Sequence, residues 1–126
     1  MYILYINDLS LVNQSLEFED VSKNISLISG YTGTITALKQ NKLLYLQGHI
    51  DFTANSYINT TIGSHYFSLQ QDCIIPVFGY GSPYIQGVGV IRFHTNNQIS
   101  LLVYTELADT NKKLSSLNFN GVGILQ

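Results

Sequence analysis

Strict alternation of apolar and polar residues is the feature that most limits how this chain can fold. Between residues 43 and 53, one set of alternate positions holds Leu44, Leu46, Gly48, Ile50 and Phe52. Successive side chains of a β-strand point to opposite faces of a sheet, so this pattern predicts a strand with an apolar inner face. The positions expected to face outward are Leu43, Tyr45, Gln47, His49, Asp51 and Thr53.

The composition favours strands along the whole chain. Of the 126 residues, 45 are Ile, Val, Thr, Tyr or Phe and only 3 are Ala, a balance that disfavours helices. Further strands are expected at 31–38, 57–62, 65–69, 73–78, 84–95, 98–106 and 114–125. About seven to nine short strands with close turns are typical of sandwiches and barrels. The predicted fold is therefore all-β, an antiparallel β-sandwich or jelly-roll-like head domain.

Turn-forming residues separate these expected strands. Lys39–Lys42 and Asn96-Asn97 are expected hairpin tips, the second because Asn tolerates a positive φ angle. The cluster Gly79–Pro83 predicts another turn. Pro76 lacks the N–H group that a central strand uses, so its strand is expected at a sheet edge or a bulge.

The first 28 residues differ from the rest. Four of the eight acidic residues precede Val21, and the apolar residues there fit helical and strand spacing equally well. We expect an N-terminal arm or linker over residues 1–28. The head domain is expected over residues 29–126, from the Ser29-Gly30 turn signal onward.

The charge balance excludes several classes of partner. Charged residues make up 11% of the chain and the formal net charge is -2, so no basic stripe is present to neutralise phosphates and no nucleic-acid partner is expected. No apolar run reaches the roughly 18 residues of a membrane span, so no membrane insertion is expected. The single cysteine, Cys73, excludes an internal disulfide and a cysteine-based zinc site.

The outward positions of the longest strands are also partly apolar. With few charged residues to cover the outside, such a patch exceeds what a monomer normally exposes. We therefore expect contact between copies of the chain that buries roughly 800 Å² on each, the alternative being a patch covered by the N-terminal segment. The expected interface residues are Leu43, Tyr45, Val88, Val90, Leu102 and Tyr104.

The polar and aromatic residues match the chemistry of sugar recognition. A sugar ring offers hydroxyl groups and an apolar face, which proteins hold with amides, carboxylates, arginine and aromatic rings. Arg92 is the only arginine in the chain. The alternative is that these polar residues only keep a low-charge protein in solution. The candidate saccharide-binding residues are Tyr80, Tyr84, Gln86, Arg92, His94, His49 and Asp51.

No catalytic residue, metal or cofactor is expected. Nucleotide-binding, metalloprotease and nucleophile-elbow motifs are missing from the sequence. His49 and Asp51 share a strand face, but side chains two residues apart stand about 7 Å from one another, too far for a direct hydrogen bond. His49, His65 and His94 lack the short spacing of a metal-ligand set. A small glycan hydrolase remains an alternative, with Asp51 paired to Asp72 or Glu106.

Several short motifs follow one another in a recognisable order. They are Gly30-Tyr31-Thr32-Gly33-Thr34, Leu46-Gln47-Gly48-His49-Ile50, Ile62-Gly63, the Asn96-Asn97 hairpin and the terminal segment Leu117–Asn120. In this order they resemble the C-terminal head domains of tail-fibre and baseplate receptor-binding proteins from phages and prophages of Gram-positive bacteria. The similarity covers about residues 28–126.

This resemblance implies a homotrimer that attaches to host cell-wall polysaccharide without chemistry. It also implies a place in the virion tail or baseplate, reached after synthesis in the bacterial cytoplasm, with the N-terminal arm contacting other virion proteins. Many such heads use a tryptophan in the sugar site, and this chain has none, so Tyr80 or Tyr84 takes that place. A structural virion or baseplate assembly subunit without a ligand is the alternative function.

Overall fold

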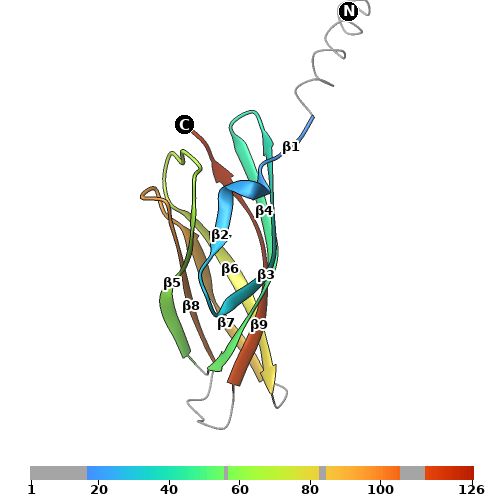
Figure 1. The fold of residues 1–126 in the computed structure, drawn as a ribbon, viewed down its shortest axis with the longest axis vertical. Coiled ribbons are helices and arrows are strands. Elements are labelled where there is room, and N and C mark those ends of the chain that lie inside the picture. The colour runs from blue at the N-terminus through green and yellow to red at the C-terminus, as the bar shows by residue number, and fades with distance from the viewer. Residues whose placement is uncertain (1–16, 56, 83–84, 106–112) are drawn as a thin grey trace, which may run out of the picture.

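The computed structural model describes residues 17–55, 57–82, 85–105 and 113–126. Antiparallel strands account for nearly all of this part of the chain, so the all-β prediction is confirmed (Figure 1). The strands are β1 (Glu19–Asp20), β2 (Ile25–Leu27), β3 (Tyr31–Gln40), β4 (Leu43–Asn55), β5 (Tyr57–His65), β6 (Cys73–Ser82), β7 (Ile85–Phe93), β8 (Gln98–Thr105) and β9 (Lys113–Ile124). A single 3-10 turn, η1 (Ser22–Asn24), joins β1 to β2 within the described residues.

The nine described strands form one continuous sheet in the order β1-β3-β4-β9-β6-β7-β8-β5-β2. The last strand of the chain, β9, lies between β4 and β6 and pairs antiparallel with both. The sheet curls on itself, so that β2 from one end lies in front of β3 near the other end (Figure 1). A curled sheet encloses an inner face, and this inner face is where the apolar core forms.

The core follows the predicted alternation. Leu44, Leu46 and Ile50 of β4 are fully buried, whereas Gln47, His49 and Asp51 are exposed on the outer face. Across the interior, the buried residues of the other strands include Ile75, Ile91, Phe93, Leu101, Val103, Leu117 and Phe119. Removal of this apolar surface from water supplies the main driving force for folding, at about 25 cal/mol per Å².

Two glycines allow close packing inside the curled sheet. A Cβ atom on Gly48 would lie 2.8 Å from the ring of Phe119, which occupies the space above the bare backbone. A Cβ atom on Gly89 would lie 1.9 Å from the carbonyl oxygen of Leu102 in the neighbouring strand. These glycines are therefore required by the core and the sheet backbone rather than by a ligand.

The described end of the predicted arm belongs to the sheet. β1 pairs with β3, β2 pairs with β5, and Val21 between them is buried. The boundary predicted at residues 28 and 29 thus falls inside the sheet, between β2 and β3, because residues 19–27 hydrogen-bond to strands that would otherwise form its edges. Residues 1–16 lie outside the described residues.

The expectation that Pro76 marks an edge strand is wrong. β6 is a central strand, paired with β7 along Cys73–Gly81 and with β9 along Val77–Ser82. Pro76 comes just before the first residue paired with β9, so its missing N–H group breaks no bond on that side. The predicted turn at 79–83 is also wrong for residues 79–82, which belong to β6: residues 79–81 pair with both β7 and β9, and Ser82 pairs with β9.

The predicted separate strand at residues 65–69 is not formed. β5 ends at His65, and Leu69 makes only an isolated bridge to Leu125. Two other hydrogen bonds form here in place of a strand ladder. The Tyr66 N–H donates to the Asn24 carbonyl, and the Phe67 N–H donates to the His65 ring. By contrast, the hairpin predicted at Asn96-Asn97 is confirmed, with Asn97 at a φ angle of 73°.

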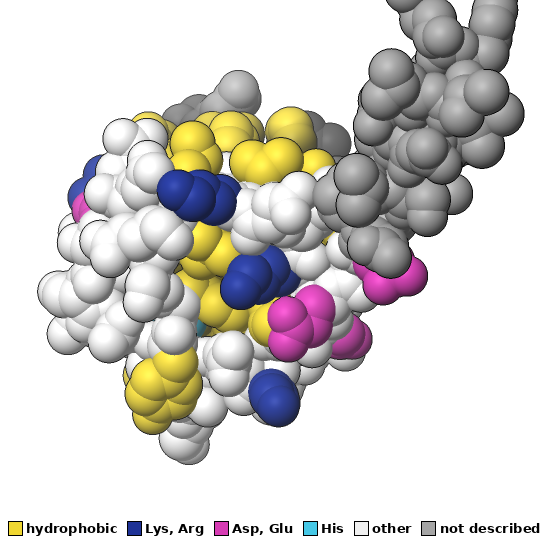
Figure 2. Space-filling model, turned by 90° about the horizontal axis from the view of Figure 1, so that it is seen from above, with side chains coloured by type: hydrophobic (Ala, Val, Ile, Leu, Met, Phe, Trp, Pro, Cys, Tyr) yellow, Lys and Arg dark blue, Asp and Glu magenta, His cyan; other side chains and the backbone are white. Residues whose placement is uncertain are grey.

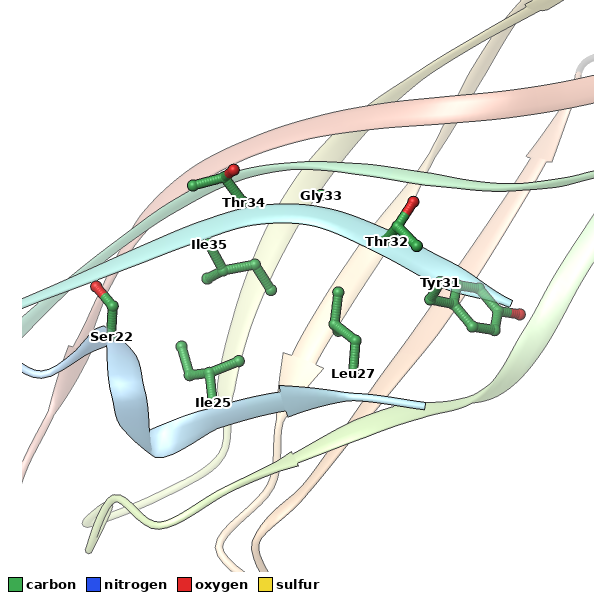
Figure 3. A pocket seen from close by; sticks show the side chains of 8 residues that line it. All are labelled: Ser22, Ile25, Leu27, Tyr31, Thr32, Gly33, Thr34 and Ile35. Atoms are coloured by element: carbon green, nitrogen blue, oxygen red, sulfur yellow. The ribbon is translucent and has the colours of Figure 1, made fainter. Parts of the chain in front are cut away.

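The curled sheet stays open between β2 and β3. Ile25 and Leu27 of β2 and Ile35 of β3 point toward one another across this opening, a cavity of about 450 Å³ (Figure 3). Hydrogen bonds close it at both ends, from the Tyr31 N–H to the Ile28 carbonyl and from the Ala37 N–H to the Ser22 hydroxyl. Among the described residues, no charged side chain lines this cavity and none of the predicted site residues reaches it.

A buried histidine ties three segments together. His65 has no exposed surface, its Nε2 lies 2.7 Å from the His94 carbonyl oxygen, and its Nδ1 accepts the Phe67 N–H. Since Nδ1 is an acceptor, the ring is neutral and Nε2 carries the proton. Burial lowers the pKa of His65 below its ordinary value, against a smaller opposing effect of the bond to the His94 carbonyl.

We expect acid to destabilise the fold through His65. A histidine with a lowered folded pKa contributes stability that is present above its unfolded pKa of about 6.5 and is lost as the pH falls through the folded pKa. Urea unfolding between about pH 7 and pH 5 should show a falling free energy of unfolding. His65→Gln, which keeps a donor and an acceptor without titrating, should reduce this fall; an equal fall in both proteins would contradict the role.

Candidate functional site

The position of β9 brings two predicted groups of site residues onto one outer face. In the register of the sheet, Asn118 of β9 pairs with His49 of β4 on one side and with Phe78 of β6 on the other. Two residues earlier on β9, Ser116 pairs with Asp51 of β4 on one side and with Tyr80 of β6 on the other. Neighbouring strands are about 4.8 Å apart, so the aromatic residues of β6 stand about 10 Å from the polar residues of β4. We refer to Asp51, His49, Asn118, Phe78 and Tyr80 as the aromatic–polar face.

A hydrogen-bonded network forms the polar half of this face. His49 Nδ1 lies 2.7 Å from Asn118 Oδ1, and His49 Nε2 lies 3.0 Å from Asp51 Oδ1. The expectation that His49 and Asp51 are too far apart for a direct hydrogen bond is therefore wrong. Their side chains lean along the strand toward each other, which closes the gap between residues two positions apart.

The network favours the charged imidazolium form of His49. The hydrogen bond to Asn118 raises the pKa of His49, and the bond to Asp51 raises it further. Both ring nitrogens face oxygen acceptors, an arrangement that only a doubly protonated ring satisfies fully. The His49 ring beside the Asp51 carboxylate presents polar groups to solvent.

Two exposed rings form the other half of the face. Phe78 is 63% exposed and Tyr80 is 46% exposed. Sequence reasoning named Tyr80 but missed Phe78 and Asn118. Strand alternation could have identified both residues. Phe78 lies two residues from Tyr80, and Asn118 lies between the buried Leu117 and Phe119, so each is expected on the outer face.

Arg92 and His94 lie elsewhere on the outer surface. Arg92 pairs with Ile74, six residues from Tyr80 along β6, a separation of about 20 Å. His94 Nε2 lies 2.7 Å from Ser100 Oγ, and its Nδ1 lies 3.5 Å from Asp72 Oδ2. These residues form a second polar cluster at the other end of the strands.

Two more predicted site residues are only partly placed. The backbone of Gln86 pairs with Tyr80, whereas its side chain and the whole of Tyr84 lie outside the described residues. The aromatic–polar face therefore unites three of the candidates, Tyr80, His49 and Asp51, with two residues that the sequence reasoning missed.

The predicted interface residues lie on the outer face in two groups. Val88 pairs with Tyr104, and Val90 pairs with Leu102 in the next step of the β7–β8 ladder. Phe78 and Tyr57 extend the first pair on either side, which makes an exposed apolar row across four strands. The strands β9 and β6 separate Val88 and Val90 of β7 from Leu43 and Tyr45 of β4.

The described residues contain no group of three His, Cys, Asp or Glu side chains arranged to hold a metal ion. Of the carboxylates weighed for glycan hydrolysis, Asp51 lies on the aromatic–polar face, Asp72 accepts the Thr95 N–H beside His94, and Glu106 lies outside the described residues. The Thr95 N–H holds the pKa of Asp72 below its ordinary value. In the part of the chain that the structure covers, no helix has the length and apolar character needed to cross a bilayer.

Comparison of the chain with protein-family models, with curated proteins and with solved structures finds no match. The chemistry of the outer surface is therefore the basis for any functional conclusion. Charged residues make up only 11% of the chain, and at the end of the molecule seen in Figure 2 the Lys, Arg, Asp and Glu side chains stand among hydrophobic and other atoms. A ligand held by amides, hydroxyls and aromatic rings suits such a surface better than a highly charged one.

We expect His49 to titrate above the ordinary histidine pKa of about 6.5. Asn118→Ala removes the hydrogen bond that contributes most to the raised pKa of His49. The variant should therefore lower the titration midpoint of His49, measured by NMR from the imidazole C–H signals. The buried His65 serves as an internal control whose midpoint should not move. An unchanged His49 midpoint in the variant would contradict the hydrogen-bond assignment.

Proposed function

We propose that this protein is a non-enzymatic adhesion head that binds saccharide on the aromatic–polar face. The observation that carries the proposal is the register of β9, which sets the exposed rings of Phe78 and Tyr80 beside the Asp51–His49–Asn118 network. A sugar can lay its C–H face on a ring while its hydroxyl groups donate to the carboxylate and exchange hydrogen bonds with the amide. The face thus supplies both halves of sugar recognition.

The resemblance to phage receptor-binding heads supports a specific ligand source and setting. On that basis the saccharide is host cell-wall polysaccharide, and the protein acts in a virion tail or baseplate. Contacts with other virion proteins through the N-terminal residues are part of the same proposal. The mixed aromatic and polar chemistry of the site agrees with this setting.

The proposal includes no catalysis because of the number of carboxylates on the aromatic–polar face. Hydrolysis of a glycosidic bond generally uses two carboxyl groups about 5 to 9.5 Å apart. Among the residues that the structure describes, Asp51 is the only carboxylate of the aromatic–polar face, and its Oδ1 already accepts a hydrogen bond from His49. A single carboxylate occupied in this way orients a sugar but does not cleave it.

Self-association completes the proposal. Val88 and Tyr104 are each 49% exposed and lie side by side, with the exposed Tyr57 next to Tyr104, whereas Phe78 on the other side of Val88 belongs to the aromatic–polar face and stays outside the contact. An exposed apolar row of this kind marks a contact surface, and we propose that copies of the chain pack there as a homotrimer. Joined copies bind a polysaccharide more tightly than one copy does, because the second contact forms at high effective concentration.

Tyr80→Ala should weaken binding to purified Gram-positive cell-wall polysaccharide by about tenfold, which corresponds to roughly 1.4 kcal/mol of lost ring contact. Tyr66→Ala is the matched control, because Tyr66 is also an exposed tyrosine but lies outside the strands of the face. Isothermal titration measures both. Wild-type protein that binds no wall polysaccharide would instead favour a structural virion subunit.

Val88→Lys should shift the protein toward a monomer in light scattering, because a lysine in the apolar row leaves a charge to be buried in the contact. Thr61→Lys, on the exposed side of β5, adds the same charge away from the row and should leave the mass unchanged. A wild-type chain that is already monomeric at high concentration would overturn this part of the proposal.

A further inference from the structure

We infer that the protein has a second saccharide subsite beside the aromatic–polar face, so that its ligand is a chain of several sugar units rather than a single terminal sugar. This inference rests on the proposed function. The subsite is a cavity of about 220 Å³ on the outer surface of β3, β4 and β9. Its lining includes Phe18, Thr36, Leu38, Tyr45, Gln47 and Asn120.

The cavity is continuous with the aromatic–polar face. Gln47 pairs with Asn120 in the step of the β4–β9 ladder next to the His49–Asn118 pair. Tyr45, in the cavity, and Asp51, at the far end of the face, both occupy outer positions of β4. Their separation of six positions along the strand corresponds to about 20 Å, a length that fits several linked sugars rather than one.

The cavity repeats the chemistry of the first site with different residues. Phe18 is 54% exposed and meets Tyr45 edge to face, with ring centroids 5.4 Å apart and planes at 73°. This pair offers an apolar wall for the C–H face of a sugar. The side-chain amides of Gln47 and Asn120 offer both donors and acceptors for hydroxyl groups.

The charge of the lining specifies the class of sugar. None of the described residues that line the cavity carries a charge, whereas the first site pairs the Asp51 carboxylate with the His49 ring. An ionised sugar would lose hydration here without gaining an opposite charge. The unit bound in the second subsite is therefore a neutral sugar.

The contact between Phe18 and Tyr45 also changes the role of Tyr45. Tyr45 was expected in the interface between copies, yet Phe18 of the same chain already packs on its ring. The tyrosine hydroxyl lies 3.4 Å from the Gln40 side-chain oxygen, which holds the ring in place. A ring held from two sides is suited to positioning a ligand.

The test compares binding to fragments of wall polysaccharide of different lengths. Purified Gram-positive cell-wall polysaccharide is partially hydrolysed and separated by size, and isothermal titration gives the affinity for the shortest and the longest fractions. Wild-type affinity should rise with length. Phe18→Ala should lower the affinity for long fragments by about tenfold and change the affinity for the shortest fragments by less than twofold.

Two further variants separate the possible outcomes. Asn120→Ala, an exposed polar substitution that leaves the core untouched, should act like Phe18→Ala. Leu43→Ala, on β4 but outside the cavity, should bind like the wild type. Tyr80→Ala should weaken binding to all lengths. Long-fragment affinity lowered by Tyr80→Ala but not by Phe18→Ala or Asn120→Ala would overturn the second subsite alone, and no wild-type binding at any length would overturn the proposed function.

Discussion

The pairing of β9 with β4 on one side and β6 on the other connects the two halves of the sheet. Without β9, the β3–β4 hairpin and the β6–β7–β8–β5 strands would be separate pieces, each with an open edge. The same strand carries Leu117 and Phe119 into the core and Asn118 onto the outer face. One set of backbone hydrogen bonds therefore supports the core and assembles the aromatic–polar face.

The small number of charged residues determines which side-chain types cover the rest of the surface. With only 11% charged residues, the outer positions of the strands are filled by amides, hydroxyls and rings. Polar and aromatic side chains on β4, β9 and β6 form the face proposed to bind a sugar. Apolar side chains around Val88 and Tyr104 form the surface proposed for contact with another copy. Both proposed properties arise from the same composition.

Much of the fold and part of the site could be predicted from local pattern. Alternation along residues 43–53 correctly separated the buried Leu44, Leu46 and Ile50 from the exposed His49 and Asp51. The prediction from Pro76 was wrong because a proline disturbs a sheet only where a neighbouring strand would accept a hydrogen bond from its missing N–H group. Pairing between β6 and β9 begins at Val77, just after Pro76. Asn118 was missed because strand order, which alternation does not encode, decides which residues become neighbours.

The sequence by itself determined that the chain is all-β and which side of each long strand is buried, since the two-residue period of a strand and the cost of exposing apolar side chains are local properties. Only the tertiary structure decided that Tyr80 joins His49 and Asp51, while Arg92 lies about 20 Å away. Contacts between distant segments depend on strand order and register, and these follow from how the whole core packs together.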